Sequence, residues 1–228
     1  MYARMIKSGI CIGCIATVAL ANQAGLFSNI DSSQRFCWGE NIGFLNWLHD
    51  IPSQGDGVTV GFDHLSGMVW AENVGWINVG SGGGPYLNDL SDSSTFGVNV
   101  NTVTGDLSGF AWGENVGWFN FATASTLSNY GQHARFDFCE NRFRGYAWGE
   151  NVGWVNLDDD EHFVAVNLSC STGDVLCDGS ISFHDFFMLS SNITGPDQQN
   201  SCTVFDSDDD RDVDLRDIAE FQRNFTGG

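Results

Sequence analysis

Basic residues are scarce in this chain. Only 9 of its 228 residues are Lys or Arg, against 29 Asp or Glu, and the formal net charge is −20. Lys7 is the only lysine. Because nucleic acids are bound mainly through Lys and Arg on their phosphates, we expect no nucleic-acid partner. The excess of carboxylates suits divalent cations, and part of it is typical of a solvated surface in a salty medium.

The residue patterns of common zinc and redox centres are missing as well. The histidines are scattered, without the HxH or HExxH spacing of zinc ligands. The only CxxC pair, Cys11 and Cys14, lies near the start of the chain. We expect that segment to be removed, and we therefore expect no zinc site.

Residues 1–21 have the pattern of a secretory signal peptide. Arg4 and Lys7 precede an apolar run from Ile10 to Leu20, and Ala19-Leu20-Ala21 fits a small-x-small cleavage site. Cleavage after Ala24 is the alternative. The apolar run is too short to span a bilayer, so we expect a secreted, extracellular or cell-surface protein with no membrane span after cleavage. Loss of Arg4 and Lys7 takes the formal charge from −20 to −22.

Five cysteines lie beyond the signal segment. In an exported protein they favour disulfides over metal thiolates. We expect one pair within the C-terminal part, Cys177 with Cys202, and a second pair, Cys37 with Cys139. The fifth cysteine is Cys170, and an odd count leaves one thiol free.

A nine-residue motif occurs four times. The copy WGENVGWVN begins at Trp148, and the others begin at Trp38, Trp70 and Trp112. Short alternating runs such as Val98-Asn99-Val100 precede three of the copies. Alternation bounded by Gly, Asn and Asp predicts half-buried strands. Residues 25–168 are therefore expected to form a mainly β repeat domain of four units, each of about three short strands.

The ends of this domain indicate how it closes. Copy one has no clear alternating run before it, whereas residues 163–167 alternate after copy four. We expect this last strand to complete the first unit and to close the domain as a small propeller or barrel-like ring, because closure removes exposed strand edges. An open stack of units is the alternative, and its free edges would permit self-assembly.

The motif has two interpretations. In the first, its tryptophans are core anchors and its Glu-Asn-Val-Gly segment is a hairpin turn. In the second, the tryptophans stack on a polysaccharide while residues such as Glu114 and Asn115 hydrogen-bond to it. The tryptophans concerned are Trp70, Trp76, Trp112, Trp118, Trp148 and Trp154.

Catalysis by the motif is not expected. Its four glutamates stand at equivalent positions, and equal environments do not separate a general acid from a general base. The acidic run 158–161 is interpreted as a solvated loop. The motif resembles WGENxGWIN-type repeats of exported bacterial proteins over residues 36–168, and this resemblance implies no activity.

Residues 171–228 contain two segments that match the twelve-residue calcium loop of EF-hands. In that loop, oxygens at positions 1, 3, 5, 7, 9 and 12 surround the ion. Arg211 replaces the usual glycine at position 6 of the second loop. The predicted ligands of this loop are Asp206, Asp208, Asp210, Asp212, Asp214 and Asp217.

The first loop is less complete. It keeps a glycine at position 6, but Leu176 stands at position 3 and supplies no side-chain oxygen. Whether one or two calcium ions bind therefore stays open. The candidate ligands of this loop are Asp174, Asp178, Ser180 and Asp185.

A segment compatible with a helix follows each loop, at 185–189 and 217–225. The segments GDVLCDGSISFHDF and FDSDDDRDVDLRDIAEFQRNF resemble the two halves of a dockerin domain. This resemblance implies a small α-helical calcium-loop domain that binds cohesin-like or cell-surface proteins. It also implies that Phe183, His184, Leu215 and Arg216 occupy the positions that meet the partner. Phe183 and Leu215 could instead close the module on itself.

Together these features predict an exported, non-catalytic, calcium-binding surface or matrix protein with a dockerin-like docking tail. The alternative is a carbohydrate-binding module that is tethered to a polysaccharide-degrading complex and uses its repeated tryptophans. No enzyme activity is expected in either case.

Overall fold

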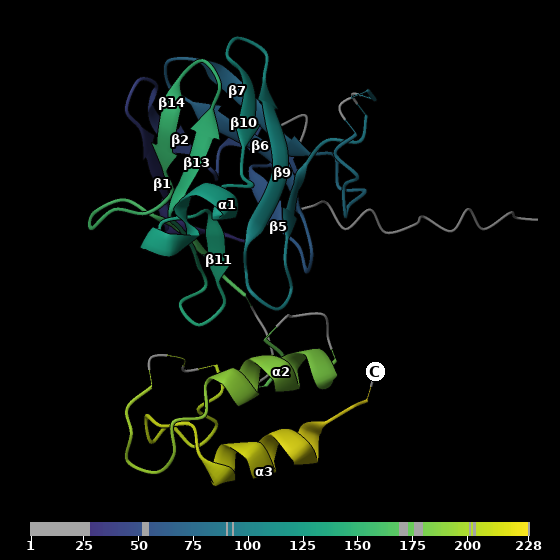
Figure 1. Cartoon of the computed structure of the whole chain (residues 1–228), viewed down its shortest axis with the longest axis vertical. Coiled ribbons are helices and arrows are strands. Elements are labelled where there is room, and N and C mark those ends of the chain that lie inside the picture. The colour runs from purple at the N-terminus through teal and green to yellow at the C-terminus, as the bar shows by residue number, and fades with distance from the viewer. Residues whose placement is uncertain are drawn as a thin grey trace, which may run out of the picture.

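The computed structural model describes residues 28–51, 55–89, 91–92, 94–168, 173–175, 180–200, 202 and 204–227. The predicted signal peptide, Cys170, Leu176, Cys177 and Asp178 lie outside these residues, as does the side chain of His184. Figure 1 shows a β domain above a C-terminal pair of helices. No helix among the described residues is long and apolar enough to cross a membrane.

Eight antiparallel strands of the β domain close into a barrel. The last strand around the barrel pairs with the first through Trp38 and Asn156. The prediction of a mainly β domain closed like a barrel is therefore confirmed, and the open stack is wrong. The strands, in order around the barrel, are β1 (Ile30–Gly39), β2 (Gly43–Asn46), β6 (Leu65–Ala71), β7 (Gly75–Gly80), β9 (Leu107–Gly113), β10 (Gly117–Asn120), β13 (Tyr146–Gly149) and β14 (Gly153–Asn156).

Each copy of the motif forms one hairpin of the barrel. In the third copy Trp112 stands opposite Trp118, and Gly117 has a positive φ of 81° at the turn, where a Cβ would be strained. The last residue of each copy pairs with the first residue of the next copy around the barrel, as Asn78 does with Trp112. The motif thus encodes both the hairpin and its contact with the neighbouring hairpin.

A ring of hydrogen bonds joins the four hairpin tips. The asparagine at the fourth position of each copy donates its side-chain N–H to a backbone carbonyl in the tip of the adjacent hairpin. These bonds satisfy carbonyls that no strand partner reaches. They run from Asn41 to Val152 (3.0 Å), from Asn73 to Ile42 (3.1 Å), from Asn115 to Val74 (2.9 Å) and from Asn151 to Val116 (3.1 Å).

Further short elements extend the barrel at the opposite end. β5 (Val58–Val60) pairs with β6, β8 (Val98–Val100) pairs with β9, and β15 (Val164–Val166) pairs with β1, the last as expected from the sequence. β12 (Arg142–Arg144) pairs with β15, and β11 (Arg135–Asp137) pairs with β12. The remaining elements of the domain are β3 (Asp50–Ile51), β4 (Gly55–Asp56), α1 (Ala124–Leu127) and the 3-10 turn η1 (Ser128–Tyr130).

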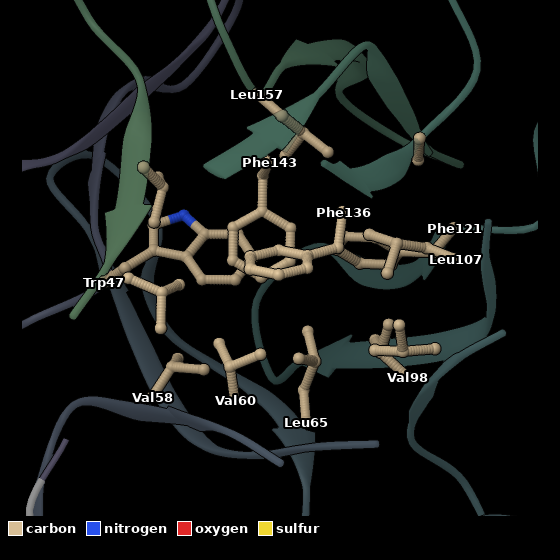
Figure 2. Close-up of a cluster of buried hydrophobic side chains, with 14 of the residues drawn as sticks. Trp47, Val58, Val60, Leu65, Val98, Leu107, Phe121, Phe136, Phe143 and Leu157 are labelled. Carbon is tan, nitrogen blue, oxygen red and sulfur yellow. The ribbon is translucent and has the colours of Figure 1, made fainter. Parts of the chain in front are cut away.

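The hydrophobic core of the domain lies under this extended end. Figure 2 shows Trp47 beside Phe143, with Phe136 on the other side of the Phe143 ring. The Trp47 and Phe143 ring centroids are 4.9 Å apart, and Trp47 is 1% exposed. Its indole N–H donates to the sulfur of Cys37 at 3.2 Å. Trp47 is the one tryptophan outside the motif, and it is the one at the centre of the core.

The repeated tryptophans lie on the outer face of the barrel instead. Along β9, Ala111 and Gly113 are buried, so Trp112 between them points outward. Trp38 and Trp148 are 40% exposed. The interpretation of the motif tryptophans as core anchors is therefore wrong, because the residues that alternate with them, from Ala111 to Phe119, are the ones that fill the interior.

One disulfide links the β domain to the C-terminal part, between Cys139 and Cys202. The expected pairs Cys177–Cys202 and Cys37–Cys139 are both wrong. Cys139 lies in the turn between β11 and β12, whereas Cys37 points into the barrel, where it is a buried free thiol. Burial raises the pKa of this thiol to about 12, which keeps it protonated and unreactive.

Candidate functional site

The carboxylates of the second loop gather in two groups of three. Within each group, one side-chain oxygen per residue lies within 4.8 Å of the others. All six predicted ligands of this loop belong to these groups. The first group is Asp206, Asp208 and Asp210, and the second is Asp212, Asp214 and Asp217.

Backbone N–H groups hold the first turn of the loop. The carboxylate of Asp206 accepts from Asp210 at 3.1 Å and from Arg211 at 2.8 Å. Arg211 has a φ of 75°, so it adopts the left-handed conformation that glycine usually supplies at position 6. The left-handed conformation costs a residue with a side chain roughly 1–2 kcal/mol relative to glycine. The loop nevertheless makes the sharp turn with Arg211 at this position.

Asp217 ties the loop to the helix that follows, α3 (Leu215–Asn224). One carboxylate oxygen accepts from the Ser207 N–H at 2.7 Å, and the other accepts from the Asp214 N–H at 2.8 Å. Asp214 in turn caps α3 by accepting from the Arg216 N–H at 2.7 Å. This capping box fixes the position of the ligands relative to α3.

The electrostatics of the loop favour a bound cation. Burial, and then the neighbouring aspartates, raise the pKa of Asp208 and of Asp212. Asp212 is only 5% exposed, and its Oδ1 atom is buried without a hydrogen-bond partner among the described residues. The exposed Arg216 guanidinium comes within 3.4 Å of Asp210. Oxygen ligands crowded in this way suit a hard divalent ion such as calcium or magnesium.

The described part of the first loop repeats this arrangement 32 residues earlier. Asp185 accepts from the N–H of Val175 and from the N–H of Ser182, both at 2.9 Å, as Asp217 does in the second loop. Asp174 and Asp185 are buried at 4% and 0% exposure. Ser180 is half-buried. The structure therefore places the carboxylate of the last candidate ligand, Asp185, on the backbone N–H of Val175, the residue after the first candidate ligand.

The two halves of the C-terminal part are related by pseudo-two-fold symmetry, and the segment after the helix of each half hydrogen-bonds to the loop of the other half. This pairing was not predicted from the sequence. Thr194, which follows α2 (Phe183–Ser191), donates its N–H to the carbonyl of Val213 at 3.0 Å. Thr226, which follows α3, bonds in the same way to Ile181 at 2.9 Å. The signal was present in the sequence, because an Asn-x-Thr-Gly segment ends each half.

The predicted partner-binding residues stand at the heads of the two helices. Phe183 is 60% exposed and Leu215 is 77% exposed. The Phe183 ring also meets the Phe225 ring at 5.1 Å between centroids, so Phe183 contributes in part to closing the module on itself. The Arg216 side chain is also exposed, at 73%. Helix α2 exposes Phe187 as well, at 57%, a residue that the sequence did not single out.

The six candidate glycan-binding tryptophans form three separate pairs, one on each of the second, third and fourth hairpins. The ring centroids are 4.8 Å apart in Trp70–Trp76, 4.6 Å apart in Trp112–Trp118 and 4.8 Å apart in Trp148–Trp154. Their edge-to-face contact is the arrangement that aromatic pairs prefer. The structure distributes these pairs around the barrel and does not bring the six residues together.

Comparison with protein-family models, with curated proteins and with solved structures finds no match for this chain. The fold defines the class, which is a closed eight-stranded antiparallel barrel with a helical C-terminal part attached by a disulfide.

Proposed function

We propose that the chain is an exported, non-catalytic, calcium-binding surface or matrix protein, whose dockerin-like tail attaches it to a cohesin-like or cell-surface protein. One observation carries this proposal. The two halves of the tail repeat the same contacts, and each half presents an exposed apolar residue, Phe183 or Leu215, at the head of its helix. A module built twice in this way offers two equivalent docking faces.

Calcium is the proposed cofactor of the tail. Seven aspartates within twelve residues repel one another, and a divalent ion that neutralises them would also order the capping box of α3. The buried unpartnered Oδ1 of Asp212 adds to the cost of leaving the loop without a cation.

We further infer that the barrel is an internal repeat of four units. The support is the recurrence of the same bonds in all four hairpins, including the ring of asparagine side chains at the tips. Such symmetry also supports the absence of catalysis. The motif glutamates Glu40, Glu72, Glu114 and Glu150 stand at equivalent positions of the four hairpins, which argues against a division into a general acid and a general base.

A calcium titration by calorimetry tests the proposed metal site. The mature protein should bind calcium, and Asp206→Ala should abolish binding at the second loop. If Asp174→Ala leaves the stoichiometry unchanged, the tail holds one ion and the first loop is a scaffold. If Asp174→Ala removes a second ion, both loops are occupied. Absence of binding by the unaltered protein at millimolar calcium would refute the proposal.

Carbohydrate binding is the second candidate, and the outward position of the motif tryptophans favours it. Rings such as Trp148, at 40% exposure, are available to stack on a sugar. Soluble polysaccharides should then change the tryptophan fluorescence, and Trp148→Ala should reduce this change. A fluorescence spectrum that stays constant across a glycan panel would count against this candidate. Self-assembly has less support, because the closed barrel leaves only short strands such as β5 and β8 with free edges.

A further inference from the structure

Two adjoining hollows lie on the outer face of the barrel, and they share Phe44 and His162. The first has a volume of about 470 Å³ and the second of about 530 Å³. The first is lined by Phe36, Phe44, Asn46, Trp70, Glu72 and His162. The second is lined by Trp38, Phe44, Asp159, Asp160, Glu161 and His162. We call the two hollows together the Phe44 groove.

The Phe44 groove lies where the repeat departs from its own pattern. Copy one carries Phe44 at the position where the other three copies carry tryptophan. The Phe44 ring meets Trp38 at 4.8 Å, His162 at 4.9 Å and Phe36 at 6.1 Å between centroids. The smaller ring leaves space beside these neighbours, and several aromatic rings border that space.

Carboxylates border the groove on both sides. Glu72, at the tip of the second hairpin, stands on one side, and the acidic loop 159–161 stands on the other. Asp159 holds that loop by accepting from the N–H groups of Glu161 at 2.8 Å and of His162 at 2.6 Å. Among the described residues no Lys or Arg lines either hollow, although the Arg35 guanidinium carbon lies 5.1 Å from the Phe36 ring centroid.

We propose that the Phe44 groove binds a small organic cation with an alkylammonium group. Aromatic faces attract such a cation through their quadrupole, and carboxylates around them add Coulomb attraction. The groove volumes fall within the range of small-molecule sites. The four carboxylates would repel an anionic ligand. This site is on the barrel and does not depend on calcium binding or docking by the tail.

A neutral sugar could use the same aromatic rings, but it would gain nothing from the net charge of the groove. The comparison of a cation with its uncharged isostere therefore separates the two ligand classes. Choline and 3,3-dimethylbutan-1-ol have similar shapes, and they differ in the positive charge.

The experiment is a titration of the full mature protein with choline and with this isostere, followed by the NMR shifts of the indole N–H signals. Choline should bind at least about tenfold more tightly than the isostere. Phe44→Leu, which keeps an apolar side chain without the ring face, should weaken choline binding by about three- to tenfold. Glu72→Gln, at an exposed position, should also weaken it.

Trp118→Ala is the matched control, because it alters an aromatic pair on another hairpin and should leave choline binding unchanged. Equal affinity for choline and the isostere would overturn the proposal. So would unaltered choline binding in Phe44→Leu, or no binding of choline at all. Binding of a neutral oligosaccharide at Phe44 in place of choline would assign the groove to glycans.

Discussion

Replacement of Trp47 by alanine is expected to lower the free energy of unfolding of the barrel by about 3–5 kcal/mol. The side chain is 1% exposed and packs against Phe143. Its loss leaves a cavity in the core and removes the partner of the Cys37 sulfur. For a domain of this size, the melting temperature should fall by roughly 10 °C. Thermal and denaturant unfolding, followed by circular dichroism, would measure both changes.

Trp148→Ala is the matched control for this prediction. It removes the same side chain from the outer face, where the residue is 40% exposed and pairs with Trp154. The expected loss is about 1 kcal/mol, which is the contribution of one aromatic cross-strand pair. If Trp148→Ala destabilised the protein as much as Trp47→Ala, the motif tryptophans would be core residues and the outward orientation would be wrong.

The orientation of the tryptophans shows what the sequence could and could not predict. The motif and its alternating runs predicted strands and favoured a closed ring over an open stack, but they did not decide between a propeller and a barrel. They did not fix which face points inward, because large aromatic residues are typical of buried positions. The available signal lay in the first strand of each hairpin. There small residues such as Ala111, Gly113, Ala147 and Gly149 flank the tryptophans and point into the barrel, beside larger interior residues such as Phe119.

The pairing of Cys139 with Cys202 could not be predicted from the sequence. Pairing depends on the distance between Cα atoms, which for Cys139 and Cys202 is 4.4 Å across 63 residues of sequence. Nothing in the local sequence places the β11–β12 turn next to the C-terminal part. The aspartate rhythm of the second loop, by contrast, predicted the six clustered residues, because it is a local pattern that needs no tertiary information; the pattern indicated one ring of ligands, whereas the structure has two groups of three.

Asp217→Asn is expected to weaken calcium binding by the tail at least about 100-fold and to destabilise α3. Asp217 is 2% exposed, and each of its carboxylate oxygens accepts a backbone N–H. Asparagine would keep one acceptor but would turn an amide donor toward either Ser207 or Asp214. The substitution therefore removes a ligand charge and breaks the capping box in one step.

Asp209→Asn provides the comparison, because it removes the same charge from the same loop. Asp209 lies outside both carboxylate groups and has a φ of 60°, a conformation that asparagine tolerates. The calcium affinity of the Asp209→Asn variant should stay within about threefold of the affinity of the unaltered protein, because only the general attraction between the loop charge and the cation changes. Calorimetry would give the affinities, and the helical circular dichroism signal with calcium or with EDTA would report α3. Equal losses in the two variants would mean that calcium responds to the total charge of the loop and not to a built site at Asp217.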